Sequence, residues 1–167
     1  MNFLPTENIT YKTHLNEEEI IKRLSDHVET EETLSYGIFN SGSSKPYVGQ
    51  INDQTFNIKR IISYRNSFLP RIYGIIEKDF GGSTIIVKMR LHTFVIVFLG
   101  IWCCFVGIAS AASLRQALGN QGFNSKTMIP LGMLLFFYAL IMVSFKYESY
   151  KSKMDLQTIF EADIVEG

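Results

Sequence analysis

The sequence predicts an α+β membrane protein, in which a small helix-and-sheet domain precedes two membrane-spanning helices. Three observations predict this class. The 167-residue chain contains two long apolar stretches, and no Asp or Glu occurs between Phe80 and Tyr147. All sixteen acidic residues therefore lie in the first 79 or the last 20 residues. The residues before the first apolar stretch form short runs rich in β-branched and aromatic side chains, which is typical of strands.

An amphipathic helix is predicted over residues 17–30. Asn16 can cap the free N–H groups of its first turn, and the acidic run 17–19 suits the positive end of a helix. Apolar residues then recur at helical spacing, and they are Ile20, Ile21, Leu24 and Val28. We expect this apolar face to pack on the sheet that follows.

About five strands are predicted after this helix, because turn-forming residues separate the apolar runs. The predicted strands cover residues 34–39, 47–51, 56–64, 72–77 and 84–91. In the last of them Ile85, Val87 and Met89 alternate with residues expected to be more exposed to water, so one face of the sheet should be buried. Sequential strands with short turns favour an antiparallel meander, curved or partly closed into a barrel.

The two apolar stretches cover residues 94–113 and 127–145. At 1.5 Å per residue each is long enough to cross a hydrocarbon core of roughly 30 Å. Two buried helices of a soluble protein are the alternative, but the preceding residues are too few to cover two helices that are apolar on every side. We therefore predict a transmembrane hairpin, with helices at 92–114 and 127–147 and a short external loop at 115–126.

The distribution of charge predicts the orientation of this hairpin. Residues 1–55 carry four basic and nine acidic side chains, whereas residues 56–90 carry seven basic and two acidic ones. This basic block directly precedes the first span, and the loop between the spans has only Arg115 and Lys126. The positive-inside rule therefore places both termini in the cytoplasm, with residues 1–91 as a cytoplasmic helix plus β domain.

The remaining cytoplasmic part, residues 148–167, is predicted to be a helix and tail that pack back on the β domain. Leu156, Ile159 and Phe160 lie on one face at helical spacing. The net charge of the whole chain is zero and no recognition motif is present, so we expect no nucleic-acid partner.

No motif in the chain predicts catalysis, and we expect no catalytic residue, metal or cofactor. The three histidines are isolated from other metal ligands, and no nucleophile elbow or phosphate-binding loop occurs. Cys103 and Cys104 are adjacent within an apolar stretch, where they are interpreted as small apolar fillers.

Binding candidates come from the basic block and from small residues in the spans. The basic candidates are Lys59, Arg60, Arg65, Arg71, Lys88 and Arg90. They can bind anionic lipid head groups, each contributing on the order of 1 kcal/mol, or they only set the topology or pair with the acidic N-terminal helix. The candidates for close helix packing are Gly100, Cys104, Gly107, Ala111, Gly132 and Ala139. Their partner is the other helix of the hairpin or a second copy.

The stretch Tyr64-Arg65-Asn66-Ser67-Phe68-Leu69-Pro70, with the residues that lead into the first span, resembles a family of uncharacterised small bacterial membrane proteins with two transmembrane helices. This resemblance implies a bacterial plasma (inner) membrane and carries no activity. A β domain beside a membrane hairpin is also similar, at the level of fold alone, to bacterial pleckstrin-homology-like modules.

Three functions follow as hypotheses. The first is a non-catalytic membrane protein that presents a cytoplasmic β module for protein or anionic-lipid binding. The second is an oligomeric membrane effector or pore, assembled through the small residues of the first span. The third is a membrane-associated enzyme, for which Tyr64, Arg65 and Asn66 form the polar cluster that could be nominated. The expected partners are membrane lipids and either a second copy or another membrane protein.

Overall fold

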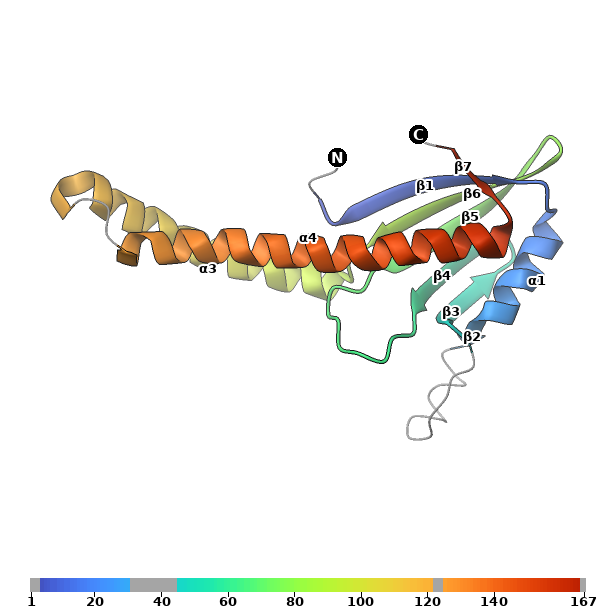
Figure 1. Ribbon diagram of the computed structural model, residues 1–167, viewed down its shortest axis with the longest axis horizontal. Helices are drawn as coiled ribbons and strands as arrows, with labels where there is room; N and C mark the ends of the chain where they lie inside the picture. Colours follow the sequence, from blue (N-terminus) through green and yellow to red (C-terminus); the bar gives the residue numbers. More distant parts are fainter. Residues whose placement is uncertain (1–3, 31–44, 122–124, 166–167) are drawn as a thin grey trace.

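The computed structural model describes residues 4–30, 45–121 and 125–165, and within them the protein is α+β, with a seven-stranded sheet and three α-helices (Figure 1). The elements in chain order are β1 (Thr6–Thr13), α1 (Glu17–His27), β2 (Val28–Thr30), β3 (Tyr47–Asn52), β4 (Thr55–Arg60), β5 (Arg71–Asp79), β6 (Gly82–Arg90), α3 (Thr93–Gln116), the π-helical segment η1 (Ala117–Gln121), α4 (Ser125–Phe160) and β7 (Asp163–Val165).

The strands form one mixed sheet in the order β2-β3-β4-β5-β6-β1-β7. The predicted antiparallel meander is confirmed for β3 to β6, but the prediction of about five strands is wrong. β2 runs parallel to β3, β1 lies between β6 and β7, and both pairings of β1 are antiparallel. β2 and β7 stand at opposite ends of the strand order, so the described sheet does not close into a complete barrel.

The missed strands have identifiable causes. In β1, the buried residues Ile9, Tyr11 and Thr13 are separated by polar residues, so the segment contains no apolar run. β7 has only three residues, which is too short for a pattern to be recognised. The strand expected to reach residue 64 ends at Arg60, because the chain leaves the sheet after the N–H of Ile61 donates to the carbonyl of Pro46. The strand predicted at 34–39 lies outside the described residues.

The N-terminal helix begins as predicted and ends earlier. The side chain of Asn16 accepts a hydrogen bond from the N–H of Glu19 at 2.8 Å, so it caps α1. Ile20 and Leu24 are fully buried, which confirms the predicted apolar face. The helix ends at His27 because the next three residues pair with β3 as strand β2.

The two long helices are apolar and mostly uncovered. α3 and the first half of α4 extend side by side away from the sheet, whereas the second half of α4 runs along it (Figure 1). By length and composition both helices could cross a membrane; the most apolar stretch of α3 has no buried residue, and only 6% of that of α4 is buried. The helix predicted after residue 147 continues the second apolar helix without a break, because α4 runs to Phe160.

The core lies between one face of the sheet and the helices α1 and α4. Phe145, Leu156 and Phe160 of α4 are fully buried there. The ring of Phe160 lies 5.8 Å from that of Tyr11 and 6.0 Å from that of Phe56, measured between centroids. The apolar face predicted for the C-terminal segment therefore packs on the sheet.

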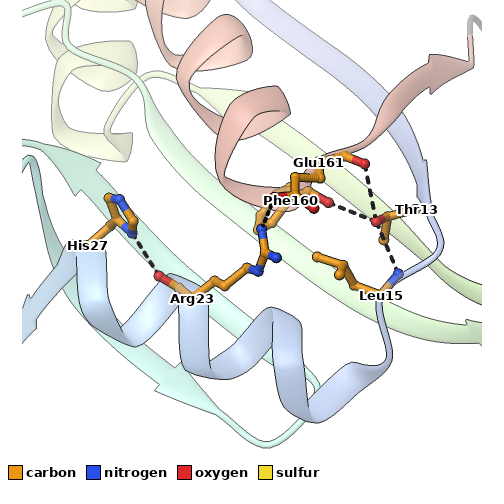
Figure 2. A network of polar contacts seen from close by, with 6 residues as sticks. All are labelled: Thr13, Leu15, Arg23, His27, Phe160 and Glu161. Carbon is orange, nitrogen blue, oxygen red and sulfur yellow. Dashed lines mark hydrogen bonds and ion pairs between the residues drawn. The ribbon is translucent and has the colours of Figure 1, made fainter.

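A network of polar contacts joins the end of β1 and helix α1 to the end of α4 (Figure 2). The hydroxyl of Thr13 donates to the carbonyl of Phe160 at 2.7 Å and accepts from the N–H of Leu15 at 3.2 Å. Arg23 of α1 pairs with Glu161 at 2.6 Å, and this hydrogen bond lowers the pKa of the Glu161 carboxyl. The chain turns at Glu161, where φ is +45°, and continues into β7.

Candidate functional site

Three of the predicted basic residues stand in one row across the sheet. Lys59 of β4 lies opposite Arg71 of β5, and Arg71 lies opposite Arg90 of β6. We call Lys59, Arg71 and Arg90 the basic row. Their neighbours in sequence, such as Ile58 and Ile72, are buried in the core, and side chains alternate along a strand. The basic row therefore lies on the opposite, open face of the sheet, which neither α1 nor α4 covers in the described part of the chain.

The electrostatics of the basic row are unfavourable within the protein. Like charges directly opposite each other on neighbouring strands repel. Among the described residues, no carboxylate pairs with any member of the row. The guanidinium of Arg90 lies 4.6 Å from the ring centroid of Tyr73, a cation–π contact that leaves its charge in place. An anion placed at the row would relieve this repulsion.

The basic row lies at the end of the sheet from which the long helices extend (Figure 1). β4 ends at Arg60, β5 begins at Arg71, and α3 begins at Thr93, three residues after Arg90. Lys88, a fourth predicted residue, is exposed on the same face and lies opposite Tyr73. It is two residues further along the strand, which is about 7 Å from the level of the row.

The other two basic candidates lie elsewhere. Arg60 pairs with Asp155 of α4 at 2.9 Å, and the hydroxyl of Tyr47 donates to the same carboxylate at 3.3 Å. Burial and then the charge of Asp155 raise the pKa of Tyr47. Arg60 thus pairs internally, but with α4 and not with the acidic N-terminal helix. Arg65 is exposed on the connection formed by residues 61–70.

Sequence reasoning missed a buried polar strip on α4. Glu148, Ser149 and Ser152 are fully buried, although none is apolar. One oxygen of Glu148 accepts a hydrogen bond from the hydroxyl of Tyr64, and this bond raises the pKa of Tyr64. The other oxygen, Oε2, and the hydroxyl of Ser149 have no hydrogen-bond partner among the described residues. Ser152, Ser149 and Glu148 lie four, seven and eight residues before Leu156, so they share its face of the helix. This spacing could have predicted that they are buried.

The connection 61–70 contains the polar cluster nominated for an enzyme, and the structure gives two of its members local contacts. Tyr64 bonds to Glu148 of α4. The side chain of Asn66 accepts from the N–H of Phe68 at 2.9 Å, which closes a turn within the connection. These contacts hold the connection against α4 and shape it.

An apolar groove lies where this connection meets α3. Its volume is about 630 Å³. The rings of Trp102 and Phe137 are 4.5 Å apart, which joins α3 to α4 at the groove. The lining residues are Ser67, Phe68, Phe94, Val95, Phe98, Leu99, Trp102 and Phe137.

The small residues predicted for helix packing are not in close contact within the chain. A Cβ atom added at Gly100, Gly107 or Gly132 would meet no atom within 4 Å. Cys104, Ala111 and Ala139 are exposed. A contact between the two long helices is made instead by the larger side chains of Trp102 and Phe137. The prediction that these residues pack helices therefore stays a prediction for a second copy.

No group of three His, Cys, Asp or Glu side chains that could hold a metal ion occurs in the described parts of the chain. Comparisons with known proteins add no further assignment: no family model matches the sequence, and neither a curated protein nor a solved structure shows significant similarity to it.

Proposed function

We propose that this is an integral membrane protein that crosses the bilayer twice, through α3 and α4, and binds anionic lipid head groups with its basic row. The observation that carries the proposal is the alignment of Lys59, Arg71 and Arg90, without acidic partners, where the long apolar helices leave the sheet. Head groups lie at that level of a bilayer, and each cation near a negative leaflet contributes on the order of 1 kcal/mol.

The surface of the hairpin supports the membrane part of the proposal. Phe94, Phe105 and Phe136 are each more than half exposed, and other large apolar side chains along both helices are exposed with them. A water-soluble surface rarely exposes contiguous apolar area of this extent. α3 has 24 residues and is about 36 Å long, which exceeds the roughly 30 Å hydrocarbon core.

The orientation follows from the charges that flank the hairpin. The basic row and Lys146 lie at the sheet end of the two helices, whereas residues 114–126, which join the helices at the other end, include only Arg115 and Lys126 as charged residues. The positive-inside rule then assigns the sheet and both ends of the chain to the cytoplasm. The family that the stretch Tyr64–Pro70 resembles makes a bacterial plasma membrane the membrane we propose.

The membrane part can be tested with the two native cysteines. Cys103 and Cys104 are exposed on the surface of α3, in the middle of the helix. We expect both thiols to resist a membrane-impermeant maleimide in intact and permeabilised cells, and to react once SDS dissolves the bilayer. A cysteine-free variant with Lys78→Cys should label only after permeabilisation, and one with Leu118→Cys should label in intact cells. Rapid labelling of the native thiols in permeabilised cells would contradict the proposal.

The lipid-binding part needs a matched pair of charge variants. We expect Arg71→Gln/Arg90→Gln, purified in mild detergent as the full chain, to retain less phosphatidylglycerol relative to phosphatidylcholine than the wild type. Two cations at about 1 kcal/mol each correspond to at most about a thirty-fold loss of affinity. The control Lys22→Gln/Lys78→Gln removes two exposed cations at the other end of the domain and should retain the wild-type ratio. Equal ratios in all three proteins would overturn head-group binding.

A second candidate function is self-association along α3, as an oligomeric effector would require. The uncovered positions at Gly100 and Gly107 favour it, because small residues let helices approach closely in lipid. Oxidative crosslinking through Cys103 or Cys104 in native membranes should then give a dimer. A protein that stays monomeric under these conditions would remove this candidate.

A further inference from the structure

The apolar groove lies along the first part of α3. Five of its lining residues belong to α3, and they run along one side of the helix from Phe94 to Trp102. Eight residues of helix correspond to about 12 Å along the axis. Ser67 and Phe68 of the connection 61–70 line the end near the sheet, and the contact of Trp102 with Phe137 lies at the deep end.

We propose that this groove holds one acyl chain of an anionic phospholipid whose head group the basic row recognises. The inference rests on the proposed membrane function and adds to it a defined site for a single lipid. Seven of the eight lining residues are apolar, and the eighth is the neutral Ser67, so the groove suits a hydrocarbon. Its volume of about 630 Å³ falls within the range of roughly 300–1,000 Å³ for sites that hold small molecules.

The cations stand close enough to the groove for one lipid to reach both. Phe68 is three residues before Arg71, and Phe94 is four residues after Arg90. The separation of the Cα atoms therefore cannot exceed about 11 Å in the first pair and about 14 Å in the second. Arg65, exposed two residues before Ser67, adds a further positive charge on the connection itself. A lipid chain in the groove would place its phosphate among these cations.

A helix of a second copy fits the groove less well than a lipid chain. A transmembrane helix must continue through the whole bilayer of roughly 30 Å, whereas the groove covers about 12 Å of α3. The rings of Trp102 and Phe137, whose centroids are 4.5 Å apart, line the end of the groove away from the sheet. A flexible acyl chain can end or bend there. The connection 61–70 is also held by the bond of Tyr64 to Glu148, so the mouth of the groove is already formed.

The source of binding energy differs from that of a site in water. Surrounding lipid solvates a chain as well as the groove does, so burial by itself provides no driving force in the bilayer. Packing against the rings fixes the position of the chain, and the charges supply the preference for an anionic lipid. We therefore expect one bound lipid per protein, with selectivity for the head group.

Trp102 provides the test, because it is the only tryptophan of the chain and lines the groove. Full-length protein in detergent micelles is titrated with phosphatidylglycerol that carries brominated chains, which quench tryptophan on contact, and in parallel with brominated phosphatidylcholine. We expect saturable quenching at about one lipid per protein, with a midpoint for phosphatidylglycerol at least three-fold lower. The control Trp102→Phe/Phe105→Trp moves the indole to an exposed position outside the groove and should show only quenching that rises linearly with lipid.

Two further variants separate the chain site from the head-group site. Ser67→Phe fills the mouth of the groove and should abolish the saturable quenching, while Cys103 stays protected in membranes. Arg71→Gln/Arg90→Gln should keep saturable quenching but bring the two midpoints together. Linear quenching in the wild type, or saturation unchanged by Ser67→Phe, would overturn the groove as a chain site even if phosphatidylglycerol is still retained. Equal midpoints in the wild type would instead overturn head-group recognition, which is the lipid-binding part of the proposed function.

Discussion

The two faces of strand β5 differ in what they contribute to the protein. Ile72, Gly74 and Ile76 point into the core and are buried, whereas Arg71 and Tyr73 alternate with them on the open face. The covered face is packed closely and fits the helices. The open face keeps like charges aligned across three strands, an arrangement that stability alone does not favour. The difference indicates that the covered face specifies the fold and the open face is available for a ligand.

The largest change in the free energy of unfolding is expected for a substitution on the covered face, at Gly74. A Cβ atom there would lie 2.0 Å from the ring of Phe56, which is only 3% exposed and cannot withdraw. Gly74→Val should therefore lower the free energy of unfolding by about 3 kcal/mol through overpacking, although valine favours strands. The measurement is the urea midpoint of the full chain in detergent, followed by circular dichroism.

A neighbouring position on the open face supplies the control for this variant. Ile75→Val changes a side chain that is 45% exposed, and the midpoint should move little. Adding Phe56→Leu to Gly74→Val should recover part of the loss, because the smaller side chain makes room for the new methyl groups. Equal stability of Gly74→Val and the wild type would contradict the close packing of this face.

An intermediate effect is expected where the covered face meets the end of α4. Thr13→Val keeps the shape of the side chain but leaves the carbonyl of Phe160 and the N–H of Leu15 without their hydroxyl partner. The expected cost is about 1–2 kcal/mol. Hydrogen exchange should accelerate at the end of α4 and in β7. The control is Thr10→Val on the other face of β1, and faster exchange in both variants alike would argue against a special role for Thr13.

The elements that could be predicted from sequence are those whose signals are local. The capping of α1 by Asn16, the meander β3 to β6 and the two long apolar helices all follow from patterns within one segment. β1 could not be placed, because its main partner is β6, and their paired residues are 70 to 84 positions apart in the sequence. β7 has three residues and exists as a strand only because β1 is there to pair with it.

The candidate site could be predicted by residue type but not by arrangement. The basic residues before the first span were visible, yet which of them share a face depends on the register of β4 with β5. A strand reaching residue 64, as predicted, would have a different register, whereas the chain leaves the sheet at Arg60 and returns at Arg71. The polar strip at Glu148 was hidden for a related reason, because buried polar side chains carry no hydrophobic signal.

The smallest change in the free energy of unfolding is expected on the open face, where a substitution should stabilise the protein and not destabilise it. Arg71→Gln removes the middle charge of the basic row, so it should raise the free energy of unfolding by about 0.2–1 kcal/mol while weakening retention of phosphatidylglycerol. Arg60→Gln is the matched comparison, because it removes the half-buried cation that pairs with Asp155 and should lower stability. Urea midpoints in a lipid-free detergent measure both. Were Arg71→Gln to destabilise the protein as Arg60→Gln does, the row would serve the fold rather than a ligand. A gain in stability joined to a loss of lipid would mean that the repulsion persists because binding requires it.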